Sequence, residues 1–147
     1  MRLLARMVWL VLLAYGITGC VREPRTLVWH KHACDFCKMT LVDDRYGALL
    51  ETEKGRVYRF DDISCMLKYG NQHFPDFHEV QVRLVVDFSH PGKLIPAEEA
   101  FYLKSEKLVT PMESNIASFG SKTEFDRHKK KLKGIYLVWG ELITQFK

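Results

Sequence analysis

The sequence predicts an α+β domain of two tandem ββαβ units with mostly antiparallel sheets, preceded by an N-terminal signal peptide and a short tether. Three observations lead to this class. Capping residues mark two helices, β-prone runs flank each helix, and the order strand, strand, helix, strand occurs twice. Such an order favours helices on one side of antiparallel sheets. We expect the two units at about residues 30–90 and 91–147.

The first twenty residues predict a lipoprotein signal peptide. Arg2 and Arg6 form a positive n-region, Met7–Tyr15 is apolar, and Ile17-Thr-Gly-Cys20 resembles a lipobox cleavage site. The apolar run is shorter than the about 20 residues that a transmembrane helix requires. We therefore expect a cleaved leader rather than a membrane span.

Cleavage before Cys20 would remove residues 1–19 and leave the lipid on Cys20. Residues 20–29 carry charges and a proline without periodicity, which is typical of a tether, and residues 30–147 form the folded domain. The chain is then lipid-anchored and extracytoplasmic. Since no aspartate follows Cys20 directly, we expect the outer membrane of a Gram-negative host, facing the periplasm.

The first unit is expected to contain a hairpin, a helix and a third strand. The hairpin strands are Gly47–Thr52 and Arg56–Phe60, joined by a loop in which a glycine can take positive φ. Asp61-Asp62 suits the N-cap and first turn of the helix, which Gly70 can close. Apolar residues alternate with polar ones through Val80–Phe88, so we expect one buried face on this strand.

The second unit repeats this order. Its expected elements are strands at Ala100–Leu103 and Asn115–Phe119, a helix at about Lys122–Leu132 and a strand at Ile135–Leu142. Ser121 and Glu124 match a capping box, and Gly134 stands where a left-handed residue commonly ends a helix.

Composition argues against two broad functions. The chain has 22 basic and 18 acidic residues, a balance too even for nucleic-acid binding, and the basic cluster Arg127–Lys133 suits a solvated helix face. The sequence has no Ser-His-Asp order, phosphate loop or nucleotide signature. We therefore do not expect an enzyme.

Three cysteines, Cys34, Cys37 and Cys65, remain once Cys20 is assigned to the lipid. An odd number cannot all pair, which indicates a metal site, a redox thiol, or one disulfide with a leftover thiol. In Cys34-Asp-Phe-Cys37-Lys-Met39 two sulfurs can converge, and an extended continuation would put Met39 on the same face as Cys37. Thiolate and thioether donors together favour Cu(I).

Other ligand candidates come from elsewhere in the chain. Met112 lies in a proline-stiffened loop where no apolar periodicity requires a methionine. On its helix Cys65 points away from the apolar stripe that contains Met66, so it is an auxiliary ligand or a small packing residue. His30 and His32 alternate like surface strand residues and are secondary candidates.

Two other functional classes stay open, a thiol-disulfide oxidoreductase and a zinc-binding structural lipoprotein. A redox pair of the thioredoxin type needs its first cysteine at a helix N-terminus, whereas the residues after Cys37 are β-prone. A four-ligand zinc site usually needs a second ligand pair, and the chain offers Cys65 and scattered histidines. Asp43-Asp44 and Asp61-Asp62 are expected as turn and cap residues.

Five motifs carry a resemblance to a known family. They are the lipobox at Cys20, Cys34-Asp-Phe-Cys37-Lys-Met39, the run Tyr58–Met66, Ala100-Phe-Tyr102 and Thr110-Pro-Met112. With these motifs the chain resembles the NosL family, copper-binding lipoproteins associated with nitrous oxide reductase. The resemblance implies a tandem ββαβ fold and a metallochaperone that delivers Cu(I) to the copper-sulfide centre of nitrous oxide reductase in the periplasm, or to another exported copper protein.

The resemblance also implies roles for individual residues. Cys37, Met39 and Met112 match the metal-binding positions of the family, Cys34 adds the sulfur of a cysteine pair, and Cys65 matches less securely. The sequence departs from the family at Glu113, where a small residue often follows the methionine. This glutamate would change the charge beside Met112.

Overall fold

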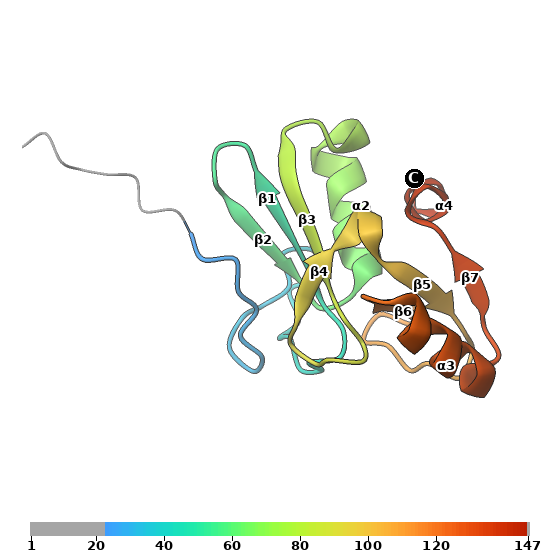
Figure 1. Cartoon of the computed structure of the whole chain (residues 1–147). Helices are drawn as coiled ribbons and strands as arrows, with labels where there is room; N and C mark the ends of the chain where they lie inside the picture. The colour runs from blue at the N-terminus through green and yellow to red at the C-terminus, as the bar shows by residue number, and fades with distance from the viewer. Residues whose placement is uncertain (1–22, 147) are drawn as a thin grey trace, which may run out of the picture.

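The computed structural model describes residues 23–146, so the expected signal peptide and the lipidated Cys20 lie outside the described part of the chain. Within these residues the strands form two antiparallel sheets, of four and of three strands (Figure 1). This architecture confirms the predicted α+β class. Over the same range, no helix has the length and apolar character needed to cross a membrane.

The first sheet holds the first ββαβ unit. Its elements are β1 (Ala48–Thr52), β2 (Val57–Phe60), helix α2 (Ile63–His73), β3 (Val80–Val86) and an added strand, β4 (Leu94–Pro96). The strand order is β2-β1-β3-β4, and Ala48 of β1 faces both Phe60 of β2 and Val85 of β3. The sequence did not predict β4, because three residues are too few to show a strand period. It lies in the range expected for the second unit but pairs with β3.

Helix α2 continues three residues past Gly70, so the prediction that Gly70 ends this helix was wrong. Gly70 instead makes room for an aromatic ring, because a Cβ at this position would lie 2.4 Å from Cε1 of Phe77. Phe77 belongs to a short 3-10 helix, η1 (Pro75–Phe77). The helix closes where the backbone N–H of Phe74 donates to the carbonyl of Gly70 at 2.7 Å.

The second sheet holds the second ββαβ unit, which confirms the predicted repeat. After the short 3-10 helix η2 (Ala97–Glu99) come β5 (Phe101–Lys104), β6 (Ile116–Phe119), α3 (Lys122–Leu132) and β7 (Ile135–Leu137), with strand order β6-β5-β7. Ser121 caps α3 by accepting the N–H of Glu124 at 3.3 Å, as expected, while the Glu124 carboxylate pairs with Arg127. The left-handed residue at the helix end is Lys133, with φ 53, rather than Gly134.

The predicted strand Ile135–Leu142 was wrong in its second half. The strand ends at Leu137, and Trp139–Gln145 forms helix α4. Val138 is the N-cap of this helix, and its N–H donates to the Glu141 carboxylate at 3.0 Å. A short apolar run fits a strand and a helix equally well. Leu142 is fully buried, so packing against the core determines which conformation this segment adopts.

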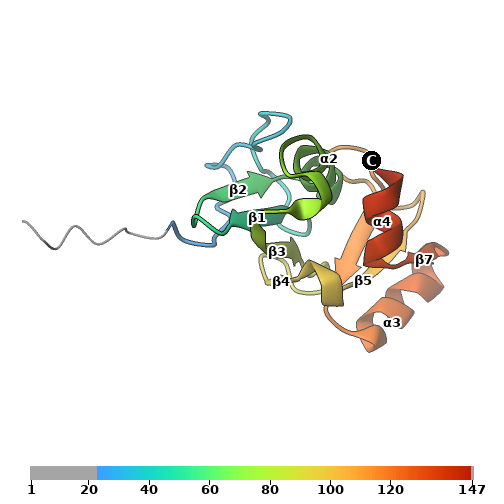
Figure 2. The same ribbon diagram turned by 90° about the horizontal axis from the view of Figure 1, so that it is seen from above.

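The two units form one body because their sheets and cores meet. Beyond β3, the N–H of Phe88 donates to the carbonyl of Ser118 in β6 at 2.8 Å, and the Ser118 hydroxyl donates to the carbonyl of Val86 at 2.6 Å. The main buried cluster includes Tyr102 and Leu142 beside residues of the first sheet. Both views show α3 and α4 with the second sheet, away from β2 (Figures 1 and 2).

Gly134 and Gly140 offer a matched test of this packing. A Cβ at position 134 would lie 2.4 Å from the carbonyl oxygen of Lys104, whereas a Cβ at position 140 meets nothing within 4 Å. Overpacking typically costs about 1–3 kcal/mol, so Gly134→Ala should lower the free energy of unfolding by that amount. Gly140→Ala should leave it unchanged or raise it by up to about 1 kcal/mol. Urea denaturation measures both, and equal effects would contradict the close approach of β5.

Candidate metal centre

Cys34 and Cys37 lie in a tight turn at the tip of an irregular hairpin. The N–H of Cys34 donates to the carbonyl of Met39 at 2.8 Å, and the N–H of Lys38 donates to the carbonyl of Cys34 at 3.0 Å. Lys38 has φ 67, so the chain reverses at this residue. The expected extended continuation from Cys37 to Met39 was therefore wrong. The pair does not start a helix, in agreement with the β-prone sequence that follows it.

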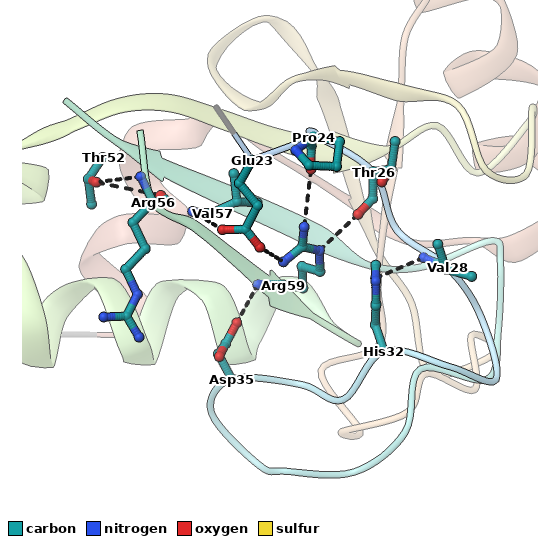
Figure 3. Close-up of polar contacts among 10 residues, drawn as sticks. All are labelled: Glu23, Pro24, Thr26, Val28, His32, Asp35, Thr52, Arg56, Val57 and Arg59. Carbon is teal, nitrogen blue, oxygen red and sulfur yellow. Dashed lines mark hydrogen bonds and ion pairs between the residues drawn. The ribbon is translucent and has the colours of Figure 1, made fainter. Parts of the chain in front are cut away.

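Asp35, inside this turn, fastens it to β2. Its N–H donates to the carbonyl of Arg59 at 2.8 Å, and its carboxylate accepts the Arg59 N–H at 2.7 Å. The Arg59 guanidinium reaches the other way, to the Glu23 carboxylate at 2.8 Å and the carbonyls of Pro24 and Thr26 (Figure 3). Residues 23–26, expected in the tether, thus lie against the edge of the first sheet.

The start of α2 supplies the third cysteine. Asp62 is the N-cap, and its carboxylate accepts the N–H of Ser64 at 2.7 Å. Cys65 follows in the first turn and is 1% exposed, while Met66 is fully buried in the core, as expected. The side chain of Cys65 faces the cysteine turn. Of the two roles considered for this residue, an auxiliary ligand fits its surroundings better than a small packing residue.

Four donor atoms converge where the turn meets α2. The sulfurs of Cys34, Cys37 and Cys65 and a carboxylate oxygen of Asp61 all lie within 4.8 Å of one another. All three cysteines are free thiols. Cys34 and Cys65 are buried and Cys37 is half-buried, so the group is accessible to solvent chiefly through Cys37. Three sulfurs this close provide ligands suited to a soft metal ion.

Asp61 is the member of this group that sequence reasoning missed. It is 3% exposed, its Oδ2 accepts the Cys37 thiol at 3.4 Å, and its Oδ1 has no hydrogen-bond partner among the described residues. The sequence held one usable signal. A helix takes a single N-cap, and Asp62 already occupies it, which leaves the preceding carboxylate without a capping role.

The pKa values of the three thiols are shifted in different directions. A hydrogen bond from Cys65 lowers the pKa of Cys34 to about 7, whereas burial raises the pKa of Cys37 to about 11. Donation to Cys34, together with burial, also raises the pKa of Cys65. The cluster therefore favours one thiolate, on Cys34, and a bound metal would have to displace the protons of the other two thiols.

The two candidate methionines differ in exposure. Met39 ends the cysteine turn and is 55% exposed, and Met112 is half-buried against the main core. The loop of Met112 is tied to the start of α2, because the Ser114 hydroxyl donates to Asp62 Oδ2 at 2.9 Å. This hydrogen bond holds the loop that contains Met112, in the second unit, against the first turn of α2, which contains Cys65.

The secondary histidine candidates do not join the four-residue group. The Nδ1 atom of His32 accepts the N–H of Val28 at 3.1 Å, and burial lowers the pKa of this ring (Figure 3). His30 is exposed and has φ 60. Both residues shape the hairpin that presents the cysteines.

The N-caps of the two longer helices offer a matched test of how Asp62 holds this site. Asp62→Ala should lower the free energy of unfolding by about 2–3 kcal/mol, because it removes a buried cap and the acceptor of the Ser114 hydroxyl. Ser121→Ala removes an exposed cap alone and should cost about 1 kcal/mol. Chemical denaturation gives both values, and an equal loss would show that the bond from Ser114 contributes nothing.

Comparison with known proteins found a matching family and a similar solved structure. The sequence model of the NosL family matches residues 26–146. No curated protein matches the chain. Among solved structures, the copper chaperone NosL from Shewanella denitrificans has a TM-score of 0.67 at 18% sequence identity, over 82% of this chain and 96% of that one. At that identity the structural match shows a shared fold, and the family match covers most of the chain. This chain belongs to the NosL family.

Proposed function

We propose that this protein is a lipid-anchored, extracytoplasmic carrier of Cu(I) rather than an enzyme. The observation that carries the proposal is the convergence of three thiol sulfurs, from the Cys34–Cys37 turn and from Cys65 in α2, within 4.8 Å. Thiolates are soft ligands and favour Cu(I) over hard cations. Met39 and Met112 would add thioether donors, which are neutral and easily displaced.

Release is the second requirement of a carrier, and the exposed part of the site supports it. Cys37 is half-buried and Met39 is 55% exposed, so an incoming ligand from another protein can reach an ion held there. Displacing a neutral thioether separates no buried charge pair. Copper would then leave by ligand exchange, without a change in oxidation state.

The client we propose is nitrous oxide reductase, whose copper-sulfide centre would receive the copper, or another exported copper protein. Family membership supports this choice, as does the shared fold with a protein described as a copper chaperone. A lipid on Cys20 would hold the carrier at the periplasmic face of the outer membrane.

Zinc binding is the second candidate, favoured by one specific observation. Asp61 provides a fourth donor beside three sulfurs, and zinc is most often held by four ligands that include oxygen, nitrogen or sulfur. Disulfide exchange has less support. A redox thiol must be both ionised and accessible, whereas Cys34, the thiol with the lowered pKa, is fully buried.

Anaerobic titration separates copper from zinc. The fragment from Val21 to Lys147, titrated against a coloured Cu(I) chelator, should bind Cu(I) tightly and zinc weakly. Cys37→Ser should weaken Cu(I) binding by about 100-fold or more, because it removes one of the three thiol ligands, the one that is partly exposed to solvent. Val42→Ala, an exposed change on the same segment, should leave the affinity unaltered. Tight zinc binding with weak Cu(I) binding would contradict the proposed function.

Lipid attachment is tested on the full chain in a Gram-negative host. A clickable fatty acid fed to the cells should label the wild-type protein and should not label Cys20→Ser, because the thiol is the site of attachment. Cys65→Ser is the matched control and should keep the label. Equal labelling of the wild type and Cys20→Ser would contradict anchoring through Cys20.

A further inference from the structure

Much of the segment expected to be a tether is built into the domain. The Arg59 guanidinium donates to the Glu23 carboxylate at 2.8 Å. It also donates to the carbonyls of Thr26, at 2.9 Å, and Pro24, at 3.1 Å (Figure 3). The Glu23 carboxylate in addition accepts the N–H of Val57 at 3.2 Å. One arginine of β2 therefore fixes the start of the described chain to the edge of the first sheet.

The next residues of this segment lead into the core. Leu27 is 7% exposed and belongs to the main buried cluster. The Arg25 guanidinium pairs with the carboxylate of Glu51, which is fully buried in β1. An opposite charge offsets part of the cost of burying a carboxylate, so detaching Arg25 would be unfavourable. Residues 23–27, the docked segment, are thus part of the folded domain.

The docked segment leaves little chain between the domain and the lipid. Cys20, the expected site of lipid attachment, stands three residues before Glu23. A chain spans at most about 3.6 Å per residue, so Cys20 lies within about 11 Å of Glu23 whatever conformation the residues between them take. The lipid therefore holds β2 and the docked segment, together the anchored edge, closer to the membrane than the rest of the domain.

The charge of the anchored edge suits a phospholipid surface. Arg56 is exposed just before β2, and Lys31 is exposed just after the docked segment. The two acidic groups beside them are engaged within the protein, since Glu23 pairs with Arg59 and Asp35 accepts the N–H of Arg59 at 2.7 Å. Anionic lipid headgroups attract exposed cations near the membrane, so contact with the headgroups meets no unpaired carboxylate from Glu23 or Asp35.

We infer that the anchored edge lies against the phospholipid headgroups of the membrane that holds the lipid, an inference that rests on the proposed lipid anchor. The short reach of the chain sets this orientation, and the domain does not move on a flexible linker. Because Asp35 fastens the cysteine turn to Arg59, the partly exposed Cys37 is carried on the strand that faces the membrane.

Two native tryptophans can report the orientation. Cleavage before Cys20 removes Trp9, which leaves Trp29 and Trp139 of the three tryptophans in the sequence. Trp29 follows the docked segment closely, whereas Trp139 begins α4, which both views place away from β2 (Figures 1 and 2). Both side chains are half-buried, so they are matched probes.

The first experiment measures tryptophan quenching in the lipidated full-length protein. Vesicles of phosphatidylethanolamine and phosphatidylglycerol carry a lipid with a spin-labelled headgroup, and Trp139→Phe and Trp29→Phe isolate the two signals. Quenching of Trp29 should exceed that of Trp139 by about twofold or more, because the chain reach holds only the anchored edge near the headgroups. Equal quenching of the two tryptophans would overturn the inference.

An insertion tests whether the reach sets the orientation. Ten Gly/Ser residues placed between Arg22 and Glu23 lengthen the reach to about 45 Å and leave the contacts of the docked segment in place. Quenching of the two tryptophans should then become equal. A difference that survives the insertion would overturn orientation by the short chain.

The last comparison tests the contacts of Arg59. Arg59→Met removes three side-chain hydrogen bonds to the docked segment, so it should remove about half or more of the difference in quenching. Arg56→Met is the control, because that guanidinium lies over the ring of Tyr58, and it should keep the difference. Equal effects of the two variants would contradict the role given to Arg59.

The outcomes separate this inference from the anchor on which it rests. If the full-length protein does not stay with the vesicles, the lipid anchor and the orientation are both overturned. If the protein stays with the vesicles and the two tryptophans are quenched equally, the anchor stands and the orientation is overturned.

Discussion

The site depends on one short interaction, the pairing of Asp35 with the backbone of Arg59. Two hydrogen bonds, at 2.8 and 2.7 Å, dock the cysteine turn onto the last residues of β2. Asp61 follows that strand directly, so the same contact sets the turn beside the start of α2 and hence beside Cys65. The contact between Asp61 and the Cys37 thiol then joins the turn to the residue that precedes the helix cap.

The junction between β2 and α2 consists of two aspartates with different roles. Asp62 satisfies the backbone of the helix and also accepts the Ser114 hydroxyl from the second unit. Asp61 turns toward the thiols, where one of its oxygens has no partner among residues 23–146. Both ββαβ units therefore meet at the site, which explains why the Met112 loop approaches it although that loop is remote in sequence.

Residues with unfavourable backbone conformations lie on both sides of this junction. Lys38, next to Cys37, and Glu113, next to Met112, are non-glycine residues with positive φ. Such conformations are unfavourable for side chains with a Cβ, and proteins concentrate them where a binding geometry requires them. The buried, unpartnered oxygen of Asp61 adds a further cost, which a bound ion could offset.

The sequence by itself determined the α+β class, the tandem ββαβ order, the N-terminal ends of both longer helices and the grouping of Cys34 and Cys37, because these follow from local periodicity and turn chemistry. Only the tertiary structure decided that α4 replaces the end of a predicted strand, that β4 joins the first sheet, and that Asp61 and Cys65 face the cysteine turn. These outcomes depend on which surfaces pack together across the chain. Local sequence patterns do not encode that choice, since a buried acid or a single helical cysteine has the same neighbours in sequence whichever way it faces.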